Sequence, residues 1–318
     1  MMPAYRRIAR RSGVFIILLS LLVAACSTPS AEPAASGSAA TAASQDSPQE
    51  MEVPTRGDML PRTSPNAAVS QTVGVSDVRV SYGRPFVRGR TIFGDLVPYG
   101  DVWRTGANEA TTITFSDAVQ IEGAPLAAGT YGLFTIPGED QWTLIFNNEA
   151  DQWGAFNYDE SQDALRVAVT PAATSRSWEM MTFAVESVTD TAATAALYWA
   201  DTKVPFDLTF DTPAIIQQRA NRAAARAEDW RLPFQYAAYA LQNDMMTADA
   251  LSWVNQSIAL DENFSNLAVK AQLLAAEEQY SEAATVGQRA IRVGEDMDET
   301  PRGLDQLRER VTTWDEQQ

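Results

Sequence analysis

The chain has 318 residues, enough for two domains of ordinary size, and a formal net charge of −17. This acidic balance disfavours nucleic acid as a partner, because nucleic-acid binding depends on basic residues that neutralise phosphates. The absence of histidine and the presence of a single cysteine exclude Ser-His-Asp and Cys-His catalysis, imidazole or thiolate metal sites and an intrachain disulfide. An enzyme of this composition would use carboxylates, lysine, tyrosine or an oxygen-bound metal.

The first 25 residues have the pattern of a secretory signal peptide. Four arginines within the first eleven residues precede an apolar run, Val14 to Ala25, that is too short to span a bilayer. The run ends in VAAC, which resembles the lipobox of bacterial lipoproteins, where the cysteine is acylated. We therefore predict lipidation at Cys26 and an exported, membrane-anchored protein that faces the periplasm or the cell exterior.

Residues 26–65 are rich in Ala, Ser, Pro, Thr and Gln and contain no aromatic residue. Such a composition buries too little apolar surface to offset the entropy of ordering the chain. We predict a disordered tether that holds the folded part away from the membrane.

Residues 66–211 alternate between apolar and polar positions, which indicates half-buried β-strands. The alternation is clear in VRVSY (78–82), WTLIF (142–146) and VPFDLTF (204–210), and the turn composition of Pro137–Asp140 predicts a hairpin. About nine short strands without intervening helices favour an antiparallel β-sandwich.

Residues 212–318 change to a helical period after Asp211-Thr212-Pro213. Small and large apolar residues recur at an offset of 33 residues, as for Ala250 with Ala283, which is close to the tetratricopeptide period. A closing helix from Pro301 places Leu304, Leu307, Val311 and Trp314 on one stripe. We predict a tetratricopeptide-like helical domain, which either captures a partner peptide or packs as a small bundle on its neighbour.

Three long segments of the β region resemble a known family. The segments are VSYGRPFVRGRTIFGDLVPYGDVWRTGANEATTITF, AGTYGLFTIPGEDQWTLIFN and DQWGAFNYDESQDALRV. They are similar to the bacterial family called domain of unknown function 2911 (DUF2911), over roughly residues 64–210. The resemblance implies a secreted or lipid-anchored envelope protein, in a family that often carries a helical extension, and brings no established activity with it.

The first of these segments contains the basic cluster Arg84, Arg88 and Arg90, followed by Asp95. Converging guanidinium groups could clamp a carboxylate or phosphate in bidentate fashion. Alternatively, the arginines pair with acidic neighbours of the same protein, as exposed arginines commonly do.

The loop before TTITF carries Trp103, Arg104, Asn108 and Glu109, and the third segment adds Trp153 among further rings and acids. A loop held by a rigid scaffold favours a binding site, whereas the same polar groups could instead satisfy the loop's own backbone. Rings beside acids suit a sugar or peptide ligand, or they plug one end of the sandwich. A carboxylate pair such as Glu109 and Asp151 could also serve as acid and base in glycoside cleavage.

These observations favour a binding or scaffolding module over an enzyme, with no cofactor and no metal. The predicted ligand-binding residues are Arg84, Trp103, Arg104, Asn108, Glu109 and Trp153. Expected partners are the membrane, through Cys26, an envelope glycan or peptide, and a protein at the helical domain. The alternative is a carboxylate-dependent hydrolase that acts on envelope polysaccharide.

Overall fold

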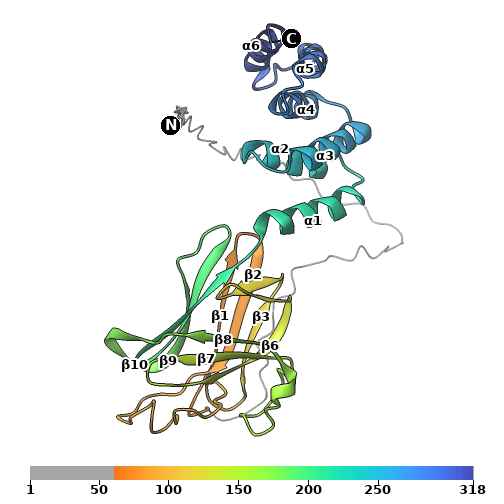
Figure 1. Ribbon diagram of the computed structural model, residues 1–318. Helices are drawn as coiled ribbons and strands as arrows, with labels where there is room; N and C mark the ends of the chain where they lie inside the picture. The colour runs from red at the N-terminus through yellow and green to blue at the C-terminus, as the bar shows by residue number, and fades with distance from the viewer. Residues whose placement is uncertain (1–60, 318) are drawn as a thin grey trace, which may run out of the picture. The chain divides into compact units, whose positions relative to one another are not determined.

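The computed structural model describes residues 61–317, and Figure 1 shows strands followed by helices along this part of the chain. The predicted signal peptide, Cys26 and most of the predicted tether lie outside the described residues. Within them, antiparallel sheets precede six α-helices, which confirms the predicted fold class of a β domain followed by a helical domain.

Ten strands make up the β domain in the described part of the chain. They are β1 (Asn66–Val73), β2 (Ser76–Gly83), β3 (Thr111–Phe115), β4 (Val119–Ile121), β5 (Ala124–Leu126), β6 (Gly129–Ile136), β7 (Trp142–Asn147), β8 (Asp163–Val169), β9 (Ala172–Glu186) and β10 (Ala192–Thr209). The sequence pattern predicted about nine, because the three-residue strands β4 and β5 are too short to show a clear alternation.

The strands form two antiparallel sheets, one in the order β1-β2-β3-β6-β7-β8 and one in the order β5-β4-β10-β9. The predicted hairpin at Pro137–Asp140 is confirmed, since Ile136 of β6 pairs with Thr143 of β7 across it. Alternate side chains of both sheets enter one apolar core, where Val78, Ile113 and Leu208 are fully buried. Period-two alternation in the sequence thus becomes the inner and outer faces of a sandwich.

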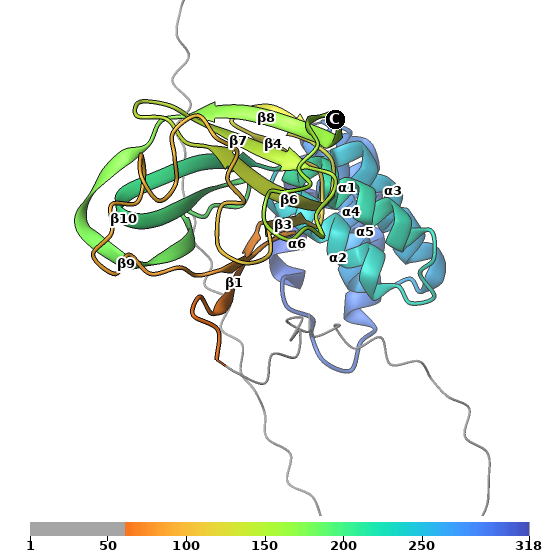
Figure 2. The same cartoon turned by 90° about the horizontal axis from the view of Figure 1, so that it is seen from below.

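The long strands β9 and β10 curve strongly, as Figure 2 shows, and their pairing shifts register on both sides of Ala200. Ala200 has a positive φ of 50°. Such an irregularity re-aims the neighbouring side chains. Beside it, Tyr198 and Trp199 are both buried although they are consecutive residues, and Trp199 belongs to the core.

The helices are α1 (Thr212–Ala224), α2 (Arg231–Gln242), α3 (Thr247–Leu260), α4 (Phe264–Ala276), α5 (Tyr280–Glu295) and α6 (Leu304–Asp315). The side chain of Asp211 accepts a hydrogen bond from the Ala214 amide and caps α1, and a proline lies in its first turn. Both features match the predicted helix start, because a cap and an early proline suit unpaired N-terminal amides.

Each helix contacts the next one along the chain. Helices α2 and α3 correspond to α4 and α5 at the predicted offset of 33 residues, and the equivalent residues Ala250 and Ala283 are both fully buried. The stripe on α6 is buried as predicted, and Gly287 of α5 lies so close to it that a Cβ atom would come within 2.4 Å of Val311. Small residues therefore set the spacing between the helices.

Candidate functional site

The loop between β2 and β3 is pinned to the sheet by backbone hydrogen bonds. The amide of Trp103 donates to the Thr135 carbonyl at 2.7 Å, and the Thr135 amide donates back to the Trp103 carbonyl at 2.8 Å. Gly83 packs so closely against the loop that a Cβ atom would lie 2.1 Å from the Ala107 carbonyl oxygen. The loop is a rigid part of the scaffold, so the side chains that it carries are held in fixed positions.

Trp103 serves as a core residue and as a pocket wall. Its side chain is buried and stacks on Trp199, with ring centroids 5.8 Å apart and an interplanar angle of 18°. Its ring nitrogen donates to the Gly106 carbonyl at 3.2 Å. The hydrogen-bonding capacity of this ring is therefore used within the loop.

The side chain of Arg104, the next residue, has hydrogen-bonding capacity that the loop does not use. Its side chain is partly buried, and the structure shows no hydrogen bond or ion pair from it to any residue of 61–317. The Nε atom is buried without an acceptor, and burial lowers the pKa of the guanidinium. A partly desolvated charge without a partner is unfavourable, and a bound anion would relieve it.

Arg104 lines a pocket of about 320 Å³, which we call the arginine pocket. The polar lining residues are Thr63, Ser64, Arg88, Arg90, Arg104 and Asn108, and the apolar ones are Pro85, Phe86, Leu96, Val97, Trp103, Gly106, Ala107 and Trp199. None of these residues is acidic. In a chain with 41 acidic and 24 basic residues, a cavity lined by three arginines and no acid is a local reversal of the overall charge.

A second unpaired donor lines the same pocket. The ring nitrogen of Trp199 is buried and has no hydrogen-bond partner, although the residue is only 2% exposed. Buried N–H groups are nearly always paired in native proteins, so this one has unused hydrogen-bonding capacity within the protein. Arg104 and Trp199 thus each have a buried donor atom without a partner, and both residues line the arginine pocket.

The other arginines of the pocket are partly engaged. Arg90 donates from Nε to the Val87 carbonyl at 3.0 Å and from Nη2 to the Phe86 carbonyl at 2.5 Å. The guanidinium of Arg88 lies 5.2 Å from the centre of the Phe86 ring, and its backbone amide donates to Glu179. Asp95, which follows them in sequence, does not line the pocket.

Arg84 is used for structure. Its Nε donates to the Met181 carbonyl at 2.9 Å and its Nη2 to the Thr182 hydroxyl at 2.7 Å, which ties the end of β2 to β9. It lines neither the arginine pocket nor the second pocket described below. Asn108 lines the arginine pocket, and its side-chain amide donates to the Ser64 carbonyl at 3.1 Å.

Glu109 points into a different cavity, which we call the Glu109 pocket. Its volume is about 410 Å³, and Asp151 and Gln152 also line it, together with residues of strands β1, β2, β3 and β6. The carboxylate of Glu109 forms an ion pair with Arg62, with an N–O distance of 2.8 Å. The Oε1 atom of Gln152 is buried without a hydrogen-bond partner.

Trp153 is 54% exposed, and Phe156 in the same segment is 86% exposed. The backbone of Trp153 forms an isolated bridge with Glu109, yet its ring lines neither pocket. The structure therefore separates the six predicted site residues: Trp103, Arg104 and Asn108 share the arginine pocket, Glu109 lies in the other pocket, and Arg84 and Trp153 line neither.

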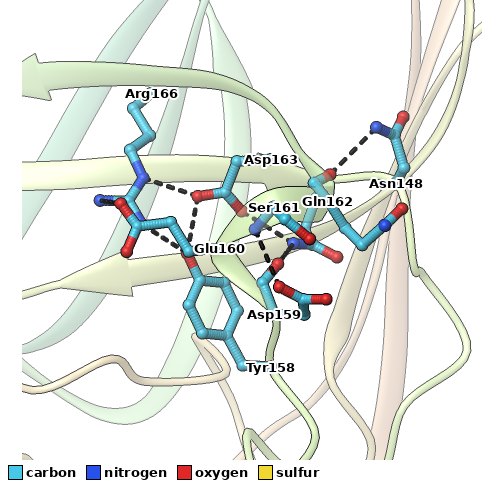
Figure 3. Close-up of polar contacts among 9 residues, drawn as sticks. Asn148, Tyr158, Asp159, Glu160, Ser161, Gln162, Asp163 and Arg166 are labelled. Carbon is cyan, nitrogen blue, oxygen red and sulfur yellow. Dashed lines mark hydrogen bonds and ion pairs between the residues drawn. The ribbon is translucent and has the colours of Figure 1, made fainter.

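The C-terminal part of the third segment, from Tyr158 to Arg166, pairs polar side chains with one another (Figure 3). The Asp163 carboxylate accepts from the Tyr158 hydroxyl at 2.6 Å, from Arg166 Nε at 2.6 Å and from Asn147 Nδ2 at 2.7 Å. Burial first, and then the bond to Asp163, raises the pKa of Tyr158 to about 12. We call Asn147, Tyr158, Asp163 and Arg166 the loop network.

Sequence reasoning did not include Trp199 or Ser64 in the site. Trp199 lies 95 residues after Arg104 and reads as an ordinary strand residue, and Ser64 falls in the predicted tether. Arg88 and Arg90 were noticed as a basic cluster, but their proximity to Arg104 depends on the fold. The strand pattern around Trp199 also does not indicate that its ring N–H is unpaired.

Residues 61–317 contain no helix that is both long and apolar enough to cross a bilayer. The same residues contain no group of three or more acidic side chains placed to hold a metal ion.

Comparison with curated proteins and with solved structures found no match. Residues 64–208 match the family described as "protein of unknown function (DUF2911)". This match supports the assignment of the β domain to the DUF2911 family.

Proposed function

We propose that the protein is a lipid-anchored bacterial envelope protein whose β domain is a binding module for an anionic ligand. The observation that carries the binding role is the unpartnered guanidinium of Arg104 in a pocket that three arginines and no acidic residue line. A guanidinium presents several fixed N–H donors that match the oxygens of an anion. The rigid loop around Arg104 holds these donors in place before the ligand arrives, which lowers the cost of binding.

The binding proposal is tested by a titration of the purified protein with small anions, followed by calorimetry and by the shift in melting temperature. We expect saturable binding that Arg104→Ala weakens by at least about tenfold, which corresponds to about 1.4 kcal/mol. Arg79→Ala is the matched control, because Arg79 lies on β2 and donates to Ser70. Equal affinity in the wild type and Arg104→Ala would contradict the proposal.

The anchor rests on the signal-like N-terminus and on the lipobox pattern that ends at Cys26. Cys26→Ser should move the protein from the membrane fraction to the soluble fraction, because an acyl chain is then absent. Retention of the variant in the membrane fraction would contradict the lipid anchor at Cys26 but not the proposed binding role.

For the helical domain we propose two tetratricopeptide-like units, α2–α3 and α4–α5, capped by α6, with a scaffolding role. The equivalent and fully buried positions of Ala250 and Ala283 support this arrangement. Leucine at either position should lower the stability of the helices to a similar extent, since both sites would be overpacked. A large effect at only one position, measured by thermal unfolding, would oppose the repeat.

One observation favours a second candidate function, a carboxylate-dependent hydrolase. Glu109 and Asp151 line the same pocket, as an acid and base pair requires. However, the ion pair with Arg62 stabilises the ionised form of Glu109, whereas a general acid must hold a proton. If the protein is a hydrolase, Glu109→Gln and Asp151→Asn should each abolish polysaccharide cleavage without unfolding the protein. A wild-type protein that cleaves no polysaccharide would contradict the hydrolase hypothesis.

A further inference from the structure

We infer that the ligand of the arginine pocket is a monocarboxylate that carries a compact apolar group. This inference rests on the proposed anion-binding function and narrows it to one class of ligand. Two sources share the chemistry: a free organic acid with a ring or branched chain, and the C-terminal carboxylate of a peptide that ends in an apolar residue. Three features of the pocket support the inference.

The first feature is the small number of uncommitted donors. Arg90 is already bonded to two backbone carbonyls, and Arg88 is exposed and lies over the Phe86 ring. Arg104 is the one of the three that is partly buried and makes neither a hydrogen bond nor an aromatic contact within the described residues, and its forked guanidinium matches one carboxylate. Arg88 and Arg90 keep their charges but are exposed to water, so one carboxylate compensates the one partly buried charge.

The second feature is the surrounding negative charge. The Oε1 atom of Glu179 accepts a hydrogen bond at 2.8 Å from the amide of Arg88, so a carboxylate lies beside this pocket residue. The chain as a whole has a net charge of −17. Outside the arginine pocket, where the three arginines do not reverse it, the field of this charge disfavours the approach of a phosphate dianion more than that of a monocarboxylate.

The third feature is the apolar wall. Phe86, Leu96, Val97, Trp103 and Trp199 line the cavity beside the arginines. A small hydrated anion would leave this surface wet, whereas a ring or branched chain would cover it and exclude water. The volume of about 320 Å³ is at the lower end of ordinary ligand pockets, which limits the ligand to roughly one ring or side chain with its carboxylate.

The apolar part of such a ligand would lie against the stacked pair Trp103 and Trp199. A ligand that carries a further oxygen next to its apolar group would in addition give the unpaired N–H of Trp199 an acceptor. Trp199 is consequently assigned a specificity role, and Arg104 the role of charge recognition.

The test is a calorimetric titration of the full protein with a matched series of probes. The probes are 3-phenylpropionate, its neutral amide, acetate, phenyl phosphate and inorganic phosphate. We expect 3-phenylpropionate to bind at least tenfold more tightly than each of the others. The amide removes the charge, acetate removes the apolar group, and the phosphates change the anion while the charge is kept or increased.

Two further probes separate the sources of the carboxylate. N-acetylphenylalanine imitates a peptide C-terminus, and its C-terminal amide is the control. Tighter binding of N-acetylphenylalanine than of 3-phenylpropionate assigns the pocket to peptide ends, and the reverse assigns it to free acids. Tryptophan fluorescence in the wild type and Trp199→Phe provides an independent readout at the pocket wall.

The variants are Arg104→Met and Arg104→Gln, with Arg79→Ala as control. Both Arg104 variants should lose the preference for 3-phenylpropionate over its amide, while Arg79→Ala keeps it. Tighter binding of a phosphate, lost in Arg104→Met, would overturn the carboxylate class and leave the anion-binding function standing. Binding of no anion, or binding that all variants retain, would overturn both.

Discussion

Two polar and aromatic segments of the β domain look alike in sequence and differ in the structure. The loop that carries Arg104 leaves the buried Nε of this arginine without an acceptor beside a cavity. The segment that ends in the loop network places Tyr158 and Arg166 on a single carboxylate, Asp163. The first arrangement has unused binding capacity, and the second stabilises its own loop.

Composition alone therefore does not separate a binding loop from a structural one. What separates them is whether each donor finds an acceptor within the protein, because an unmade buried hydrogen bond costs about 1–3 kcal/mol. Residues of the loop network should therefore contribute to stability, whereas Arg104 should contribute to affinity. Substitutions in the two regions should separate these roles, with effects on stability that decrease from Asp163 to Arg104.

Asp163→Ala should have the largest effect. The side chain of Asp163 is 8% exposed and accepts bonds from Asn147, Tyr158 and Arg166. Its loss leaves these donors unpaired, so we expect the free energy of unfolding in urea to fall by about 3 kcal/mol. Asp140→Ala, in the exposed turn between β6 and β7, is the control. A loss below about 1 kcal/mol would show that the network is not structural.

Arg84→Ala tests whether Arg84, unlike Arg104, contributes to stability and not to ligand binding. Arg84 bonds to Met181 and Thr182, so we expect a loss of about 2 kcal/mol in unfolding free energy. Ligand affinity at the arginine pocket should be unchanged, because Arg84 does not line it. A drop in affinity of tenfold or more, with unchanged stability, would show that Arg84 belongs to the binding site.

Tyr158→Phe tests the loop network through pH. The pKa of Tyr158 is raised from 10.0 to about 12, so the folded protein holds this proton more tightly than the unfolded chain does. The stabilisation is present below pH 10 and is lost as the pH rises toward 12. We expect the variant to lose about 1 kcal/mol at neutral pH. Its difference from the wild type should shrink between pH 10 and 12 in alkaline unfolding curves, and a constant difference would contradict this.

Arg104→Met should have the smallest effect on stability. The guanidinium makes no hydrogen bond within the described residues, and methionine keeps the apolar stem. We expect the free energy of unfolding to stay constant or to rise by up to about 1 kcal/mol, because a desolvated charge is removed. A destabilisation of about 2 kcal/mol or more would mean that Arg104 supports the fold.

The elements were largely predictable from local patterns. The alternation in β2, β7 and β10, the turn at Pro137–Asp140 and the stripe on α6 all depend on residues close together in the chain. The short strands β4 and β5 were not predictable in this way, because an alternation cannot be recognised in three residues. The register shift beside Trp199 was also hidden, since it depends on pairing between β9 and β10.

The candidate site was predictable only in part. The sequence identified the loop with Trp103, Arg104 and Asn108 as irregular and rich in chemistry, and these three residues share one pocket. It grouped them with Glu109, Arg84 and Trp153, which the fold places elsewhere. No local pattern shows that Arg84 bonds to β9 or that Glu109 faces a separate cavity with Asp151.

The sequence by itself determined the succession of strands and helices, the apolar faces and the absence of histidine and thiolate chemistry in the folded part. These properties follow from spacing and composition, which act over a few residues. Only the tertiary structure decided which polar groups are satisfied, because Arg104, Trp199 and Ser64 meet through folding and are distant in the chain. A free donor beside a cavity is a property of three-dimensional packing.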